Sequence, residues 1–378
     1  MLYLDYAANT PASQEALARF CEMEQNYPAN PNSFHPLGKA ALDKLNAVTA
    51  SLAQRLNVEP QEIIFTSGAS EANNLAIKGL VKAYRENGRH ILSTPLEHSS
   101  VSGALTALQE KGYEVDLLRI LPNGQVDLEH LKELLRPDTV LVSVCWTDSE
   151  LGSIQPIREI REILESFPGC RLHTDATQAA GKLPVDFALA DCTVLAPHKF
   201  DGLNGSGVLI KKKEIVLSPL IHGGTGGAVI SSTGLYRGGT PNLAHVAALE
   251  TALSNALDNM PERLAYVQEL NGFLRQKLQV YKDVCINSPQ TGSPYILNLS
   301  VKGIKGTAFR DALAEEGVCV SVKSACSVEN TPSRAVYAVS RDRKNALCSW
   351  RVSLSHYTTQ EELETFLAAF ERCLDRLS

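Results

Sequence analysis

The chain has 378 residues, a net charge of −6 and a charged fraction of 21%. This length is sufficient for two domains, and the acidic balance argues against the basic surface of a nucleic-acid-binding protein. Hydrophobic residues make up 44% of the chain, which supports a large buried core and excludes a disordered chain.

The sequence predicts no export or membrane insertion. No apolar run is long enough to span a bilayer, and residues 1–6 lack the basic and apolar segments of a secretory signal. The nine cysteines include no Cys-x-x-Cys pair, which argues against a zinc ribbon or a thioredoxin-like site. We therefore expect a cytoplasmic protein with reduced thiols and no metal site.

Short apolar runs alternate with helical patterns as far as residue 259, which predicts an α/β fold with a mostly parallel seven-stranded sheet flanked by helices. The predicted strands are Glu62–Thr66, His90–Thr94, Glu114–Leu118, Thr139–Val144, Arg171–Thr174, Thr193–Leu195 and Gly207–Ile210. The predicted helices are Pro36–Asn57, Ser70–Glu86, Val101–Lys111, Leu128–Leu135, Pro156–Glu165 and Ala244–Asn259. Ligands of such sheets bind beyond the carboxyl ends of the strands.

The remainder of the chain predicts a smaller α+β domain. Its predicted helices are Pro261–Leu278, Gly306–Glu316 and Thr359–Arg376. Its predicted strands are Tyr295–Val301, Val318–Val322 and Arg351–Ser355. We expect a large domain of residues 15–250, and a small domain formed by residues 1–14 and 251–378.

Residues 65–71 have the pattern of a strand end, a glycine turn and a helix start. The backbone N–H groups and the dipole of such a helix N-terminus bind phosphate, and Ser70 adds a hydroxyl. The alternative is an ordinary helix cap, in which a serine is followed by an acidic residue such as Glu71.

His98, Asp175 and Gln178 follow two further predicted strands. His98 is suited either to stack on a flat cofactor ring and move protons or to be an ordinary loop histidine. Asp175 is placed to stay ionised beside a protonated pyridine nitrogen, with helix N-capping as its alternative role. Gln178, one turn later, is placed to donate to a ring oxygen.

Lys199 is the most informative residue of the chain. It follows the apolar run Thr193–Pro197 and precedes the glycine-rich run Asp201–Gly207. A lysine at the mouth of a buried strand is partly desolvated, which favours its neutral and nucleophilic amine. Pyridoxal 5'-phosphate (PLP) needs a lysine for a Schiff base and a carboxylate for its pyridine nitrogen, so Lys199 and Asp175 together predict this cofactor.

Three later features have two interpretations each. The loop Tyr236–Asn242 is either a second phosphate-binding loop or a mobile surface loop. Cys326 opens a polar stretch and has Lys323 nearby to favour its thiolate, so it is either a nucleophile or an incidental loop thiol. Arg351, in an otherwise apolar strand, pairs either with a buried carboxylate or with the α-carboxylate of an amino-acid substrate.

The ordered set of these motifs resembles the cysteine desulfurases, which are PLP enzymes of the class V aminotransferase group with fold type I. The matching motifs run nearly end to end and are Leu4–Ala8, Asn30–Pro31, Thr66–Gly68, Glu97–His98, Asp175–Gln178, His198–Lys199, Arg237–Thr240, Ser324–Cys326 and Arg351. The Asp-Ala-Thr-Gln, His-Lys and Ser-Ala-Cys elements are specific in combination, although none is decisive alone.

The resemblance implies a role for each motif residue. Lys199 would carry PLP, Asp175 would pair with the ring nitrogen and Gln178 would bond the ring oxygen. His98 would stack on the ring. Ala69, Ser70 and His198 would contact the phosphate, and Thr240 would contact it from the partner subunit of a homodimer. Arg351 and Asn30 would bind the substrate carboxylate, and Cys326 would accept the sulfur.

The implied reaction removes sulfur from L-cysteine, gives L-alanine and leaves a persulfide on Cys326 for an acceptor, such as an iron–sulfur scaffold or a tRNA-thiolation protein. Two departures from the family pattern leave alternatives open. Ser149 replaces an asparagine and Ala196 replaces a serine, so two polar contacts are missing. The alternatives are a cysteine or selenocysteine lyase on the same scaffold and a non-catalytic partner in sulfur trafficking.

Overall fold

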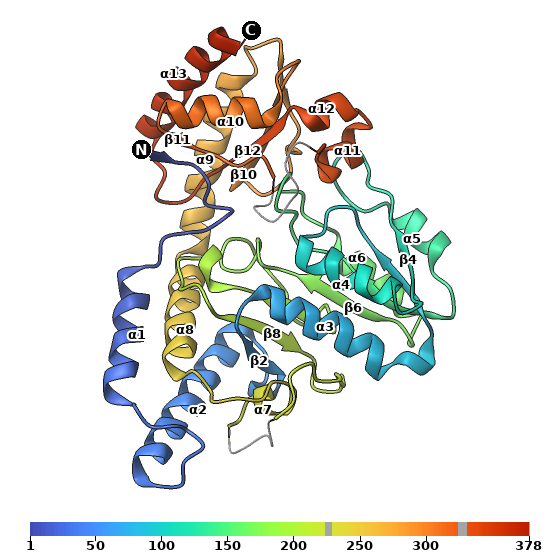
Figure 1. The fold of residues 1–378 in the computed structure, drawn as a ribbon, viewed down its shortest axis with the longest axis vertical. Helices are drawn as coiled ribbons and strands as arrows, with labels where there is room; N and C mark the ends of the chain where they lie inside the picture. Colours follow the sequence, from blue (N-terminus) through green and yellow to red (C-terminus); the bar gives the residue numbers. More distant parts are fainter. Residues whose placement is uncertain (224–228, 324–330, 378) are drawn as a thin grey trace.

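The computed structural model describes residues 1–223, 229–323 and 331–377 (Figure 1). Seven strands form its main sheet: β2 (Ile63–Thr66), β3 (His90–Ser93), β4 (Glu114–Leu117), β5 (Thr139–Ser143), β6 (Arg171–Asp175), β7 (Cys192–Leu195) and β8 (Gly207–Lys211). Their order is β2-β8-β7-β6-β5-β3-β4. β8 runs antiparallel to its neighbours β2 and β7, and the other pairs are parallel.

All seven strands lie where the sequence predicts them, and no strand end differs by more than one residue. The prediction succeeds because the sheet is covered on both faces. Every residue of β5, β7 and β8 is buried, so apolar residues follow one another instead of alternating with polar ones.

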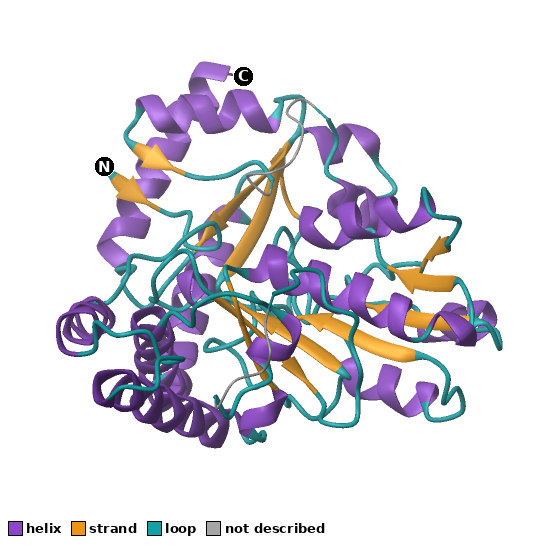
Figure 2. Cartoon of the chain, turned by 60° about the horizontal axis from the view of Figure 1, so that its bottom comes forward, coloured by secondary structure: helices purple, strands orange, loops and turns teal. Residues whose placement is uncertain are grey.

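Helices pack on both faces of the sheet (Figures 1 and 2). They are α1 (Gln14–Asn26), α2 (Pro36–Leu56), α3 (Ala69–Ala83), α4 (Ser99–Gln109), α5 (Leu128–Leu134), α6 (Ile157–Leu164) and α8 (Leu243–Asp258). α3 and α4 share one core with the sheet. On the opposite face there are two cores, one shared by α5 and α6 and the other by α2 and α8. α1 packs on α8 and is not predicted from the sequence, because Ala16 and Met23 are its two buried residues.

The C-terminal third of the chain forms a second, three-stranded antiparallel sheet in the order β12-β10-β9. The elements here are α9 (Met260–Leu278), β9 (Val284–Ile286), β10 (Ile296–Val301), α10 (Gly306–Glu315), α11 (Arg334–Ser340), α12 (Arg343–Leu347), β12 (Ser349–Ser353) and α13 (Gln360–Leu377). α9, α10 and α13 enclose a core with Trp350, whose ring stacks on Phe309 at 5.0 Å. This unit lies at the top of Figure 1.

The N-terminus belongs to the C-terminal core. β1 (Leu2–Tyr3) pairs in parallel with β11 (Val318–Cys319), and the chain then crosses to α1 (Figure 1). The predicted strand Val318–Val322 is wrong beyond Cys319, because Ser321 leaves β11 and bridges to Arg351 of β12. Shorter helical segments are α7 (Thr233–Tyr236) and the 3-10 turns Pro60–Glu62, Arg85–Asn87 and Pro197–Lys199.

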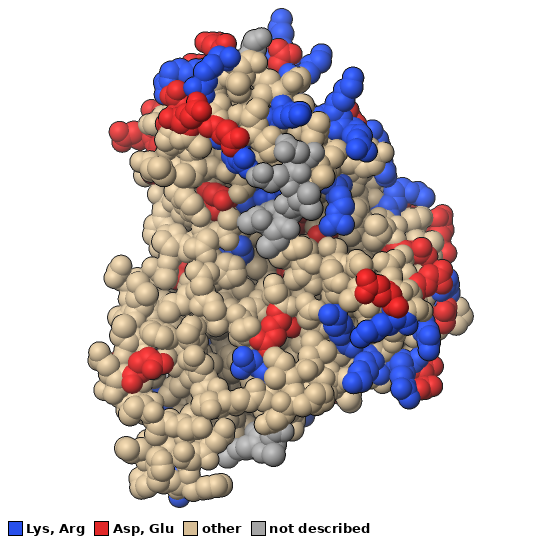
Figure 3. Space-filling view, viewed as in Figure 1, with Lys and Arg blue, Asp and Glu red and all other residues tan. Residues whose placement is uncertain are grey.

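Within the described residues, each helix lacks the length or the apolar character that a bilayer crossing needs. Figure 3 shows basic side chains gathered over α11 and α12. The exposed cations there are Arg334, Arg341, Arg343 and Lys344.

Candidate active site

A cavity of about 370 Å³ lies at the carboxyl ends of the central strands. It is lined by eight of the residues that the sequence singles out, namely Ala69, Ser70, His98, Asp175, Gln178, His198, Lys199 and Arg351. Seven of them lie at or after the ends of β2, β3, β6 and β7 of the main sheet, whereas Arg351 comes from β12 of the second sheet, so the cavity lies where the two sheets approach each other.

Lys199 ends the 3-10 turn that follows β7. Its ammonium nitrogen donates to the carbonyl oxygen of Ala7 at 3.0 Å and also to that of Ala8. Ala7 and Ala8 also line the cavity, so the N-terminal segment fixes the Lys199 ammonium at the cavity wall.

Asp175 is the last residue of β6, and both of its carboxylate oxygens have partners. Oδ1 accepts from the backbone N–H of Thr177 at 3.0 Å, and Oδ2 accepts from Nδ2 of Asn73 at 2.8 Å. Asn73 lies on α3, and its Oδ1 is 3.0 Å from Nε2 of His173. The sequence does not identify Asn73, because nothing in the α3 pattern marks this position. The Asp175 carboxylate is thus fixed at the cavity wall and does not cap a helix.

His98 is the N-cap of α4, and its Nδ1 accepts from the backbone N–H of Ser100 at 3.2 Å. The ring proton therefore lies on Nε2. Burial lowers the pKa of His98, against an opposing effect of Asp175. The pKa of His198 is lowered to about 4, mainly by burial and secondly by the positive charge of the neighbouring Lys199. Both imidazoles are neutral near pH 7.

The N-terminus of α3 has the features of an anion site. Its N-cap is Gly68, so no side chain caps the first backbone N–H groups of the helix beside Ser70. Gly68 has φ of +154°. The strand β8 approaches it so closely that a Cβ on Gly207 would lie 2.6 Å from the Gly68 backbone. The alternative of an ordinary serine cap is wrong, because Gly68 is the N-cap, and the Glu71 carboxylate accepts from the Ser67 N–H at 2.7 Å.

Arg351 lies on β12 with 2% of its surface exposed. Its Nη2 is 2.8 Å from Oδ1 of Asp5, and its Nη1 donates to the carbonyl oxygen of Ser149 at 2.6 Å. Of the two interpretations of Arg351, the pairing with a protein carboxylate is present. The guanidinium also borders the cavity, where its remaining N–H groups are placed to meet a ligand.

Buried acids line the wall behind the cavity. Burial raises the pKa of Glu97 to about 8 and that of Asp148 to about 7. Oε1 of Glu97 accepts from the Thr94 hydroxyl at 2.8 Å and from the Cys145 N–H at 2.9 Å. Glu97 is therefore mostly protonated near neutral pH, and it supports the segment that carries the cavity residue Ser149.

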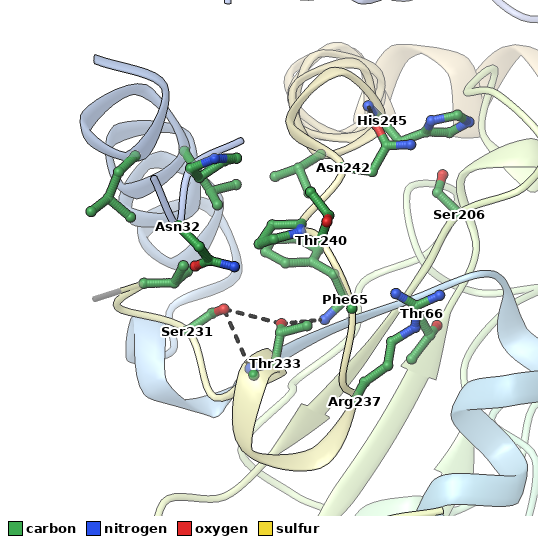
Figure 4. A pocket seen from close by; sticks show the side chains of 18 of the residues that line it. Asn32, Phe65, Thr66, Ser206, Ser231, Thr233, Arg237, Thr240, Asn242 and His245 are labelled. Carbon is green, nitrogen blue, oxygen red and sulfur yellow. Dashed lines mark hydrogen bonds between the residues drawn. The ribbon is translucent and has the colours of Figure 1, made fainter. Parts of the chain in front are cut away.

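Thr240 and Asn30 do not reach this cavity within the chain. Thr240 borders a second cavity of about 670 Å³, together with Arg237, Asn242 and His245 (Figure 4). The exposed Nδ2 of Asn30 is 3.4 Å from the Thr240 hydroxyl. Ser67 borders both cavities, which therefore adjoin at the β2–α3 turn. Cys326 lies outside the described residues.

Several further groups at the cavity have no role predicted from the sequence. Thr177 has a buried hydroxyl with no hydrogen-bond partner among the described residues, although it stands inside the Asp-Ala-Thr-Gln motif that could have identified it. The carbonyls of Ala7 and Ala8 could not be found from a pattern, because any residue supplies such an acceptor. Cys145 lines the cavity too, as one of the buried thiols that the sequence predicts.

Comparison with known proteins agrees with the geometry. Residues 2–366 match the sequence model of the family Aminotransferase class-V. The chain is 34% identical to the cysteine desulfurase IscS of Dictyoglomus turgidum, over 100% of this chain and 95% of that protein. It is 33% identical to the cysteine desulfurase IscS of a Neisseria meningitidis serogroup C strain, over 96% of this chain and 89% of that protein.

Solved structures give the same result. A structure titled NifS-like protein has a TM-score of 0.91 and 30% identity and covers 100% of both chains. One titled SspA in complex with cysteine has a TM-score of 0.81 and 29% identity and covers 95% of this chain and 100% of the other. The resemblance and the fold class predicted from the sequence are confirmed. The chain belongs to the class-V aminotransferase family and, within it, to the cysteine desulfurases.

Proposed function

We propose that this enzyme uses PLP to remove sulfur from L-cysteine, that it releases L-alanine, and that it carries the sulfur as a persulfide on Cys326. The observation that carries the proposal is the meeting of Lys199 and Asp175 in one cavity, beside the N-terminus of α3. The names of the relatives support the same reaction.

The residues at the cavity fit PLP in three places. Lys199 offers an amine at the wall of the cavity, and Asp175 offers a fixed carboxylate for a ring nitrogen. The uncapped N–H groups of α3 with Ser70 suit a phosphate, and the unpartnered Thr177 hydroxyl supplies a further polar contact. When bound, PLP supplies the electron sink for deprotonating an amino acid at Cα.

The protein groups would bind the substrate and move protons around this sink. The Lys199 amine takes the Cα proton and returns a proton to the substrate. The neutral His98 has its proton on Nε2, so this atom is placed to donate. The guanidinium of Arg351 binds the substrate carboxylate through N–H groups that Asp5 and Ser149 leave unused.

Cys326 would complete the transfer. Its thiolate attacks the substrate sulfur, an S–S bond forms as the C–S bond breaks, and the electron pair stays on the substrate carbon, which is protonated to give alanine. Ser321 and Arg351 exchange backbone hydrogen bonds of 3.2 and 2.6 Å, so the segment leading to Cys326 starts at the cavity wall. We place this segment in a small domain of residues 1–14 and 251–378, separate from a large domain of residues 15–250.

A second copy of the chain would complete the site. Thr240 and Asn30 are exposed in the single chain and lie together at the cavity that adjoins the Lys199 cavity. In a homodimer, Thr240 of one copy would contact the phosphate in the other. Asn30, next to Thr240, would then be brought to the substrate side of the same site.

The test compares the wild-type enzyme with Cys326→Ala, and Cys285→Ala serves as a control because Cys285 is an exposed thiol to which the proposal gives no role. The proposal predicts that all three proteins bind PLP and that only Cys326→Ala stops forming alanine and a protein persulfide. Unchanged alanine formation by Cys326→Ala would contradict the proposed persulfide. Pyruvate and ammonia in place of alanine would indicate a lyase.

A further inference from the structure

Lys182 is a buried lysine that the proposed reaction does not use. It lies seven residues after β6 and has 7% of its surface exposed. Within the described part of the chain it forms no ion pair. Its ammonium lies 5.7 Å above the ring of Tyr295 and 3.4 Å from Oε1 of Gln178. A buried ammonium without a carboxylate is unfavourable for folding, so its presence calls for a functional explanation.

Lys182 and Lys199 border one small space between the sheet and the C-terminal unit. The other titratable groups at this space are Tyr6, Asp201, Arg263, Tyr295 and His356. Burial lowers the pKa of Lys182 to about 7, and the positive charge of Lys199 acts in the same direction, against an opposing effect of Asp201. The charges of the two lysines therefore affect each other.

Hydrogen bonds join the two lysines through Gln178. The carboxamide oxygen of Gln178 accepts from Lys182, and its Nε2 donates to the carbonyl oxygen of Ala7 at 2.8 Å. The same carbonyl accepts from Lys199 at 3.0 Å. Because Lys182 occupies the oxygen end, the carboxamide of Gln178 cannot turn over, and the second N–H of its Nε2 stays available to the cavity that Gln178 lines.

We propose that Lys182 is a positioning residue that holds Gln178 as a donor and that, while charged, weakens the binding of a proton to the Lys199 nitrogen. The proposal rests on the proposed function, since it concerns the Lys199 nitrogen in the PLP-loaded enzyme. Two positive charges close together in a buried region repel each other, so a charged Lys182 favours the uncharged Lys199 nitrogen. Gln178, held in one orientation, donates to the ring oxygen beside that nitrogen.

The experiment titrates the visible absorbance of the PLP-loaded enzyme with pH, without substrate. Lys182→Met removes the charge and keeps the length of the side chain. Lys277→Met is the matched control, because Lys277 is exposed and its ammonium also lies over a ring, 5.6 Å from that of Phe273. We expect the midpoint of this absorbance titration to rise by about one pH unit in Lys182→Met, which is a tenfold change in the proton affinity of the Lys199 nitrogen. It should stay unchanged in Lys277→Met.

Two further measurements separate this role from a structural one. Lys182→Gln removes the charge but keeps a polar group, and it should shift the midpoint upward as well, which covers the case in which Lys182→Met does not fold. Neither variant should unfold at lower urea concentration than the wild type, because an unpaired buried charge is removed. An unchanged absorbance midpoint in a folded Lys182 variant would overturn the proposed role of Lys182 and leave the proposed function standing. Absence of any PLP band in the wild-type enzyme would overturn the proposed function and this proposal together.

Discussion

Asp5 and Arg351 are 346 residues apart in the chain and form a partly buried ion pair at the wall of the candidate active-site cavity, with 2.8 Å between Oδ1 and Nη2. The other carboxylate oxygen of Asp5 accepts from the hydroxyl of Ser321 at 2.7 Å. One N-terminal carboxylate thus connects the proposed substrate-binding arginine with the segment that leads to Cys326.

Replacing Asp5 by alanine should destabilise the protein. The change leaves the Arg351 guanidinium without its anion in a site where that arginine is 2% exposed, and loss of one partner from a buried pair costs about 3 kcal/mol. Urea unfolding measures this loss. Asp5→Asn keeps a hydrogen-bond acceptor and should lose less. Equal stability of Asp5→Ala and the wild type would show that the pair does not hold Arg351.

Replacing Asn73 by alanine should loosen Asp175. The change removes the 2.8 Å bond to the carboxylate and the 3.0 Å contact with His173, both of which are buried. Leaving such groups unsatisfied costs about 1–3 kcal/mol each. We expect a lower urea midpoint and faster loss of PLP on dialysis. Asn74→Ala is the control, because the neighbouring Asn74 bonds only to backbone oxygens. If both variants retain PLP equally, Asn73 does not position Asp175.

The buried Glu97 should make the stability of the protein fall as the pH rises. Burial raises its pKa to about 8 in the folded protein, from the usual 4.5 of a glutamate in water. Between these two pH values the folded state binds more protons than the unfolded state, so stability decreases with increasing pH. Glu97→Gln is neutral at every pH and should flatten this part of the curve. Urea midpoints measured from pH 5 to pH 8 test this, and parallel curves for the two proteins would contradict it.

Mixed dimers of the variants Thr240→Ala and Lys199→Ala test whether Thr240 is contributed by the partner subunit. Thr240→Ala should weaken PLP binding by about five- to tenfold, the effect of one lost hydrogen bond of roughly 1 kcal/mol. In a mixed dimer with Lys199→Ala, one site combines an intact Lys199 with an intact Thr240 only if the threonine comes from the other subunit. We therefore expect activity to recover on subunit exchange. Failure to recover in verified mixed dimers would place Thr240 in its own subunit's site.

Some of this architecture can be read from the sequence, for identifiable reasons. The strands of the main sheet are predictable because they are buried on both faces. Asp175 and Lys199 can be placed together because they lie at the carboxyl ends of β6 and β7. These two strands are parallel neighbours in the sheet, so their carboxyl ends lie side by side. Their pairing needs no knowledge of the connection 176–191 between these strands.

Other parts depend on contacts that a linear pattern does not contain. Asn73 and Lys182 matter through distant partners, and neither stands out from the helix or turn in which it lies. The pairing of Arg351 with Asp5 joins the two ends of the chain. Thr240 borders a different cavity of the same chain and Asn30 contacts Thr240, which a list of motifs does not reveal.

The most direct test of the central claim is the visible absorbance spectrum of the purified, PLP-loaded protein before and after addition of L-cysteine, with alanine measured in the same sample. Lys199→Ala is the reference, and Lys213→Ala is its control, because Lys213 is an exposed lysine paired with Glu59. We predict a yellow band that L-cysteine shifts as alanine accumulates, in the wild type and in Lys213→Ala but not in Lys199→Ala. A wild-type protein that takes up no PLP, or whose band responds to L-cysteine without forming alanine, would contradict the account.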